Sequence, residues 1–170
     1  MAPQVSAEQL SYTTIASPIG ELLLLGEDRA LCGLYMQRGR RPVRVDRRWR
    51  ADAAPFAGVI AELDEYFDGR RRRFETPLVM YGSEFERRVW RALREIPYGE
   101  TTSYGELART LGQPSAARAV GLANGRNPIS VIVPCHRVIG ADGSLTGYGG
   151  GLERKRTLLE LEAGQARLLV

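Results

Sequence analysis

The sequence has little of what is needed to bind a metal or to cross a membrane. Its 170 residues include one histidine, His136, and two cysteines, Cys32 and Cys135, and neither cysteine lies in a CxxC or Cys/His pattern that could hold zinc. We therefore expect no metal site and no cofactor. The longest aliphatic run, residues 22–25, is far too short to span a bilayer, and residues 1–10 lack the pattern of a signal peptide. These absences predict a cytoplasmic protein with no membrane partner.

Lysine is nearly absent as well. Of the 24 basic residues only Lys155 is a lysine, and the formal net charge is +4. Arginine suits contacts with phosphates and base edges, although the same bias can reflect the base composition of a genome. The arginine-rich segments at residues 38–50 and 70–73 read as solvated surface. The charge permits nucleic-acid binding without demonstrating it.

The first half of the chain predicts a small sheet followed by a helix. Three segments with the pattern of strands are residues 12–15, 21–25 and 31–36. The Ser-Pro-Ile-Gly turn at residues 17–20 makes a hairpin of the first two. Cys32 lies within the third strand and is expected to be a small buried hydrophobe. Apolar residues recur at helical spacing over residues 55–67, and residues 74–80 are predicted to be an extended linker between the halves.

The second half is predicted to be mostly helical and to contain a helix-turn-helix. Capping boxes at residues 83–86 and 103–106 each open a helix. Ser115 is predicted to cap the next helix, which runs to about residue 124. The short turn between the last two helices is typical of a helix-turn-helix.

The last of these helices is built of small residues around one long cation, Arg118. Small residues allow a close approach either to a neighbouring helix in a core or to the groove of a nucleic acid. Arg118, opposite the small apolar face, favours the groove. The small residues are Ala116, Ala117, Ala119, Gly121 and Ala123.

The reactive groups are concentrated in residues 132–139, Ile-Val-Pro-Cys-His-Arg-Val-Ile, which we expect to form a buried strand. The stretch places Cys135 beside the only histidine. A thiol attacks as its thiolate, and an adjacent imidazole can assist its ionisation. Taken alone, the dipeptide favours an inert buried cysteine, because neighbouring residues of a strand point to opposite faces.

Two further segments follow the Cys-His pair. Residues 140–151 are rich in glycine, which suits a backbone that wraps around a flat ligand with Tyr148 in reach; the alternative is a flexible loop. Residues 152–162 predict a last helix with a leucine core. On sequence alone, Glu162 is expected to be an ordinary surface carboxylate of that helix.

Several motifs occur in one order between residues 85 and 162, and together they resemble the O(6)-alkylguanine-DNA alkyltransferase family, the methylated-DNA–protein-cysteine methyltransferases. The reactive part of the resemblance is Pro-Cys-His-Arg-Val at residues 134–138, preceded by Asn-Pro at 127–128. The other motifs are Ile-Pro-Tyr-Gly at 96–99, Ser-Tyr at 103–104, Ala-Arg-Ala-Val-Gly at 117–121 and Tyr-Gly-Gly-Gly-Leu at 148–152.

The resemblance implies an α/β (α+β) protein of two lobes. Residues 1–76 would form a ribonuclease-H-like α/β lobe and residues 77–83 a linker. Residues 84–170 would form a mostly helical lobe with a winged helix-turn-helix that binds the minor groove of double-stranded DNA. Some relatives hold structural zinc in the first lobe, but this chain lacks the cysteines and histidines to do so.

The resemblance also implies direct reversal of DNA damage. O6-alkylguanine, and more weakly O4-alkylthymine, would be flipped out of the duplex, and the alkyl group would pass irreversibly to Cys135 in a single turnover. The protein would act as a monomer, with cooperative assembly on DNA left open. Two alternatives remain, a non-catalytic sensor of alkylated DNA, whose members replace the cysteine, and a helix-turn-helix regulator.

Roles for individual residues follow from the matching motif positions. His136 would relay a proton from Cys135 through a water, Glu162 would orient His136, and Asn127 would brace the turn near the thiol. Tyr104 would donate a proton to the leaving guanine and displace the 3′ phosphate. Arg118 would fill the gap that the flipped base leaves in the duplex. The expected DNA contacts are Tyr104, Ser115, Ala116, Ala117, Arg118 and Gly121. The expected residues of the guanine pocket are Val138, Tyr148 and Gly149.

Overall fold

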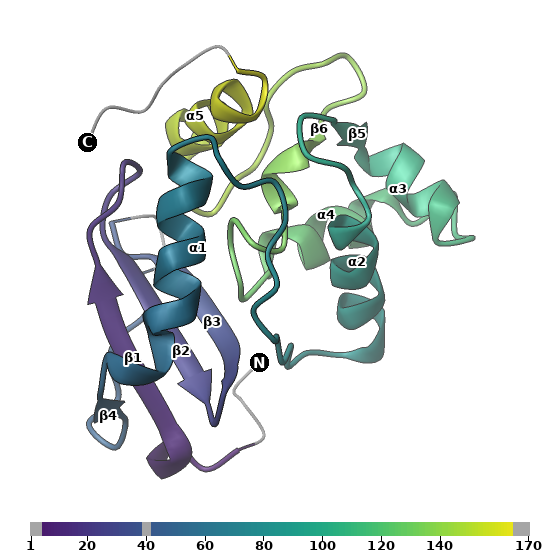
Figure 1. The fold of residues 1–170 in the computed structure, drawn as a ribbon. Coiled ribbons are helices and arrows are strands. Elements are labelled where there is room, and N and C mark those ends of the chain that lie inside the picture. The colour runs from purple at the N-terminus through teal and green to yellow at the C-terminus, as the bar shows by residue number, and fades with distance from the viewer. Residues whose placement is uncertain (1–4, 39–41, 165–170) are drawn as a thin grey trace.

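The computed structural model describes residues 5–38 and 42–164, which form a small sheet with a covering helix followed by a mostly helical lobe (Figure 1). The mixed α/β fold class expected from the sequence is confirmed. Within these residues, no helix has the length and apolar character needed to cross a membrane.

The N-terminal lobe is built on a four-stranded sheet of order β3-β2-β1-β4. The β1–β2 and β2–β3 pairs are antiparallel, with Tyr12 opposite Leu25, and β4 pairs with β1 in parallel. The predicted hairpin is confirmed, whereas the two-residue strand β4 was not expected. The elements are η1 (Ala7–Gln9), β1 (Leu10–Ile15), β2 (Leu22–Glu27), β3 (Ala30–Met36), β4 (Arg50–Ala51), η2 (Ala54–Phe56) and α1 (Ala57–Phe67).

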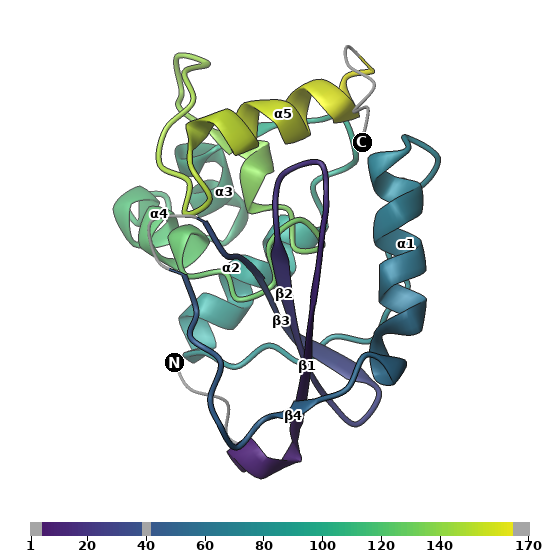
Figure 2. The ribbon, with the colours of Figure 1, turned by 90° about the vertical axis from the view of Figure 1, so that its left-hand side faces the viewer.

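Both faces of this sheet are buried, which explains the four consecutive leucines of β2. Because side chains alternate along a strand, Leu22 and Leu24 face the main core beneath α1, while Leu25 joins Leu10 and Cys32 on the other face. Figure 2 shows α1 lying alongside the sheet. Cys32 is buried, as expected for a small core residue.

As far as residue 164, the C-terminal lobe contains four α-helices and a short parallel strand pair in which Thr102 lies opposite Val138. Ser83 and Glu86 form the predicted capping box of α2, and Ser103 Oγ accepts from the N–H of Glu106 at the start of α3. The elements are α2 (Glu84–Arg94), β5 (Thr102–Ser103), α3 (Tyr104–Thr110), α4 (Ala117–Gly125), η3 (Cys135–Arg137), β6 (Val138–Ile139) and α5 (Leu152–Glu162).

Two local predictions in this lobe are wrong. Ser115 does not cap α4, because residues 113–116 form a turn closed by Ala116 N donating to Gln113 O, and the cap position falls to Ala116. Residues 132–139 are buried as expected but are not one strand. Pro134 has no N–H for a ladder, and Arg137 N donates to its carbonyl, so Cys135 begins a 3-10 turn and only residues 138–139 are extended.

The two lobes share one hydrophobic core and a backbone seam. Leu34 of β3 donates its N–H to Pro128 O and accepts from Ser130 N, so the segment leading to Cys135 pairs with the edge of the N-terminal sheet. On the same strand, Leu31 pairs with Leu78, within the segment expected to be a linker. The site of Cys135 is therefore held by strand β3 as well as by its own lobe.

Candidate active site

Cys135 lies at the start of η3 and is buried. Two asparagine side chains hold the turn that carries it. Asn127 Nδ2 donates to Val133 O (2.7 Å) and its Oδ1 accepts from Ile129 N (3.0 Å), while Asn124 Nδ2 donates to Cys135 O (3.3 Å). Val131 adopts a φ of 71°, a left-handed conformation that is costly for a β-branched residue. Buried amides thus fix a strained loop and set the position of the sulfur.

His136 forms a buried pair with Glu162. Its Nε2 lies 2.7 Å from Glu162 Oε1, and neither side chain is more than 1% exposed. Burial raises the pKa of Glu162, but hydrogen bonds from His136 and Arg137 outweigh it and bring that pKa down to about 2. Burial lowers the pKa of His136. The pair is therefore a carboxylate with a neutral imidazole, and Nε2 carries the ring proton because a carboxylate can only accept.

That tautomer leaves Nδ1 of His136 as the basic atom. Nδ1 is buried and accepts no hydrogen bond from any residue that the structure describes. A buried imidazole nitrogen with a free lone pair, next in sequence to a cysteine, is suited to take up the proton of a thiol.

Glu162 is held by two further side chains that sequence reasoning did not single out. Arg137 donates through Nε to Oε2 (2.8 Å) and through Nη2 to Oε1 (2.9 Å), and its Nη1 donates to Ile96 O (2.6 Å). The hydroxyl of Tyr66, at the end of α1, donates to Oε1 (2.7 Å). The expectation from sequence alone that Glu162 is a surface carboxylate is therefore wrong. The place of Arg137 in the Cys-His-Arg motif could have indicated a role in the site. Nothing in the sequence around Tyr66 indicated a contact with Glu162.

Neighbouring groups have opposite effects on the ionisation of the Cys135 thiol. Burial raises its pKa, while the Asn127 side chain and the positive charge of Lys155 lower it. Lys155 is itself buried, and its Nζ donates to Val138 O (2.6 Å) and Thr146 O (2.8 Å). Val138, whose backbone was expected to line the guanine pocket, accordingly has a lysine partner for its carbonyl.

A cavity of about 410 Å³ opens at Cys135, within the size range of pockets for small ligands. Tyr148 and Gly149 line it, as expected, and Tyr148 is buried; Val138 is not among its lining residues. The N-terminal lobe contributes part of the wall through Tyr35, Met36 and Val43, and the segment between the lobes contributes Tyr81. The pocket is therefore formed by both lobes.

The residues expected to contact DNA lie on α3, α4 and the turn between them. Arg118 and Ser115 are exposed, Ala116, Ala117 and Gly121 are half-buried, and Tyr104 lies against Gly121 with its hydroxyl 3.4 Å from Thr146 O. Trp90 Nε1 donates to Ala123 O (2.8 Å) and anchors α4 from behind. These residues are exposed or half-buried, whereas Cys135, His136 and Glu162 are buried.

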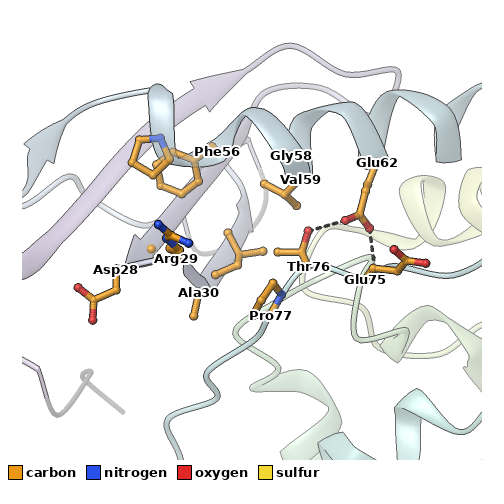
Figure 3. Close-up of a pocket in the computed structure, with 13 residues that line it drawn as sticks. Asp28, Arg29, Ala30, Phe56, Gly58, Val59, Glu62, Glu75, Thr76 and Pro77 are labelled. Atoms are coloured by element: carbon orange, nitrogen blue, oxygen red, sulfur yellow. Dashed lines mark hydrogen bonds between the residues drawn. The ribbon is translucent and has the colours of Figure 1, made fainter.

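A second hollow, of about 230 Å³, lies between the β2–β3 turn and α1 (Figure 3). Its walls include Arg29, Phe56 and Val59 but contain no cysteine or histidine. The carboxylate of Glu62 accepts from Glu75 N and from Thr76 Oγ1 (both 2.8 Å), and so supports the backbone there. This hollow lacks the nucleophile and base that the Cys135 pocket contains.

Comparison with known proteins matches both lobes. A family model described as the 6-O-methylguanine DNA methyltransferase ribonuclease-like domain matches residues 10–80, and one described as the DNA binding domain of the same protein matches residues 84–164. A methylated-DNA–protein-cysteine methyltransferase of Mycolicibacterium paratuberculosis is 56% identical over 154 residues, which cover 90% of this chain and 92% of the relative.

Solved structures agree with this result. The crystal structure of Mycobacterium tuberculosis OGT in complex with DNA is 53% identical, with a TM-score of 0.86 and coverage of 92% of this chain and 94% of that one. An O6-methylguanine DNA methyltransferase from Methanococcus jannaschii, 26% identical, gives a TM-score of 0.65 over 89% of this chain and 93% of its own. With a ribonuclease-like lobe, a DNA-binding lobe and a buried Cys-His pair at their junction, this chain belongs to the 6-O-methylguanine DNA methyltransferase family.

Proposed function

We propose that this protein repairs DNA by direct reversal, transferring the alkyl group of O6-alkylguanine irreversibly to its own Cys135. The observation that carries the proposal is the buried hydrogen bond between His136 and Glu162, which leaves Nδ1 basic on the residue that directly follows Cys135, a lining residue of the pocket. The activity named for relatives that are more than half identical agrees with it.

The reaction forms one bond and breaks another. The thiol proton leaves to His136 Nδ1 through a water, and the thiolate uses its electron pair to form a bond from sulfur to the alkyl carbon. The bond from that carbon to O6 breaks, its electron pair stays on the guanine, and the guanine takes a proton donated by Tyr104. Since the thioether has no route back to a thiol in this scheme, each molecule acts once.

The alkylated base must leave the duplex to reach a buried sulfur. Double-stranded DNA is the partner, and we infer that α4 enters its minor groove with Arg118 in the space that the base vacates. The small side chains at residues 115–117 permit that close approach. O4-alkylthymine would fit the same pocket less well. We expect a cytoplasmic protein that acts as a monomer.

The proposal is tested by incubating the protein with duplex DNA that carries O6-methylguanine and measuring the intact protein mass. A gain of one methyl group, absent with unmodified duplex, supports alkyl transfer. DNA binding with no change of mass would identify a sensor of alkylated DNA, and binding without preference for the lesion would identify a regulator.

A further inference from the structure

A third cavity, of about 470 Å³, lies between the lobes and has a positively charged lining. Its walls come from the segment that follows α1, from the C-terminal end of α2 and from the loop that precedes η3; Figure 1 shows the first of these segments running between the lobes. Four arginines line the cavity, Arg72, Arg73, Arg94 and Arg137, together with a single carboxylate, Glu95. A cleft lined by charge of one sign concentrates the electric field and attracts ions of the opposite sign.

The four consecutive arginines at residues 70–73 divide into two pairs. Arg70 and Arg71 form ion pairs with neighbouring carboxylates, at 3.0 and 2.7 Å, and neither lines the cavity. Arg72 and Arg73 do line it, and none of the ion pairs among the described residues includes either of them. The sequence predicted a uniformly solvated charge run, whereas the structure directs two of its four cations into a cavity.

An aromatic ring holds Arg72 in place. Its guanidinium lies over the ring of Tyr98, 5.3 Å from the ring centroid, and the guanidinium of Arg137 lies 5.8 Å from the same centroid. Attraction to the face of a ring orients a guanidinium without requiring an ion pair. Arg137 differs, because it already donates to Glu162 and to the carbonyl of Ile96. Arg72 is therefore an oriented cation whose charge is not neutralised by a carboxylate.

The charges of the lining residues do not balance. Arg94, at the end of α2, also has no ion pair among the residues that the structure describes. With Arg137 neutralised by Glu162, three arginines face the single carboxylate of the lining, an excess of two positive charges.

This excess favours phosphate over a carboxylate as the ligand. A carboxylate supplies one negative charge, whereas a phosphate group supplies up to two and offers more oxygens to the forked donors of arginine. Buried apolar residues, Val131 and Ile132, form part of the lining. Apolar surroundings strengthen the attraction between opposite charges, because they lower the local dielectric constant.

We propose that this cavity is a phosphate-binding site, in which Arg72, Arg73 and Arg94 donate to the oxygens of a phosphate group. Among the described residues that line it, none belongs to α3 or α4, so the site is distinct from the surface expected to enter the minor groove. Two sources share this chemistry, a free inorganic or nucleotide phosphate and the phosphodiester backbone of DNA. The site does not depend on the proposed alkyl transfer.

Two variants of the full chain test the site on separate elements. Arg72→Gln/Arg73→Gln removes two of the lining cations, and Arg94→Gln removes the third without altering the segment after α1. Arg47→Gln/Arg70→Gln is the matched control, since it makes the same change of charge at two exposed arginines that do not line the cavity. All the substituted side chains are exposed, so the variants are expected to fold, and thermal melting checks this.

The first measurement is calorimetric titration with inorganic pyrophosphate, which needs no DNA. The parent and the control are expected to bind one pyrophosphate per protein with the same affinity. Arg72→Gln/Arg73→Gln is expected to bind at least about tenfold more weakly, because hydrogen bonds between charged groups are lost, and Arg94→Gln is expected to bind more weakly than the control. No saturable binding by the parent, or equal affinity in the variants and the control, would overturn the site.

The second measurement identifies the source of the phosphate with an unmodified DNA duplex. If DNA supplies it, Arg72→Gln/Arg73→Gln lowers the duplex affinity below that of the control and reduces the slope of log affinity against log salt by about two. If a free phosphate is the ligand, the double variant and the control bind duplex equally. Both measurements use undamaged DNA or none, so a parent that accepts no alkyl group would refute the proposed function and leave this test in place.

Discussion

The hydroxyl of Tyr66 donates to Glu162 Oε1 at 2.7 Å, although 96 residues separate the two in sequence. Tyr66 lies one residue before the end of α1 in the N-terminal lobe, and Glu162 is the last residue of α5 in the C-terminal lobe; Figure 2 shows the ends of these two helices side by side. The same oxygen accepts from His136 and Arg137. The N-terminal lobe thus takes part in holding the carboxylate that orients the histidine.

Removing this hydroxyl should loosen the contact between the lobes. Tyr66→Phe keeps the ring and deletes a buried hydrogen bond to a charged group, so the free energy of unfolding should fall by about 1.5–3 kcal/mol. Urea denaturation measures it. Tyr12→Phe is the control, since Tyr12 is half-buried in the same lobe and its hydroxyl has no hydrogen-bond partner among the described residues. Equal losses in both variants would contradict a specific role for the Tyr66–Glu162 bond.

Glu162→Gln should slow alkyl transfer and raise the apparent pKa of the Cys135 thiol. A neutral amide still accepts from His136 but no longer stabilises the imidazolium that forms when the thiol loses its proton. The measurement is the single-turnover rate against pH with methylated duplex. A profile that matches the parent would return Glu162 to a purely structural role.

The Glu162 carboxylate should also make the free energy of unfolding depend on pH in the acid range. The folded-state pKa of Glu162, about 2, lies below its ordinary value of 4.5, so its contribution to stability is complete above about pH 4.5 and is lost as the pH falls toward 2. Urea midpoints of the parent should therefore drop through this window more steeply than those of Glu162→Gln. Parallel curves would show that Glu162 does not carry the acid sensitivity.

Asn127→Ala should damage both stability and rate. It leaves the buried Ile129 N without a partner, at a cost of about 1–3 kcal/mol, and it removes the amide from Val133 O, which keeps its bond from Cys135 N. The turn that sets the position of the sulfur would then be free to relax. Denaturation midpoints and single-turnover rates test this, with the exposed Gln113→Ala as control. A variant as stable and fast as the control would refute the bracing role.

Arg118→Ala should slow repair in duplex DNA much more than transfer from free O6-methylguanine base. Flipping a base loses stacking and pairing, which costs a few kcal/mol, and a side chain in the gap offsets part of that cost. Comparison of the two single-turnover rates isolates this contribution. Equal losses with both substrates would mean that Arg118 supports the fold or the pocket, and no loss with either would remove α4 from the DNA interface.

Local patterns predicted most of the fold. Residues 152–162 form the last helix with the bounds expected, and the hairpin, the capped helices and the helix-turn-helix follow from turn and cap residues that act over a few positions. The wrong predictions concern positions where contacts with other residues determine the local structure. Pro134 interrupts the expected strand, and a turn at residues 113–116 takes the cap from Ser115. Strand β4 exists only because it pairs with β1, almost 40 residues earlier.

The candidate site could be predicted only where its residues are close in sequence. Cys135 and His136 are adjacent, and the family resemblance added Asn127 and Glu162. The burial of Glu162 and Lys155 depends on partners from other elements, including Tyr66 and Thr146. Charged residues on a helix are ordinarily expected to face solvent, so the sequence of α5 gave no sign of these contacts.

The central claim is that Cys135 accepts one alkyl group and no more. The most direct measurement is peptide mass mapping after incubation with excess duplex that carries O6-methylguanine, for the parent, Cys32→Ser and Cys135→Ser. The account predicts one methyl group per protein on the peptide of Cys135, the same for Cys32→Ser, and none for Cys135→Ser, which should still bind DNA. Methyl groups on Cys32, or more than one damaged base repaired per protein molecule, would contradict it.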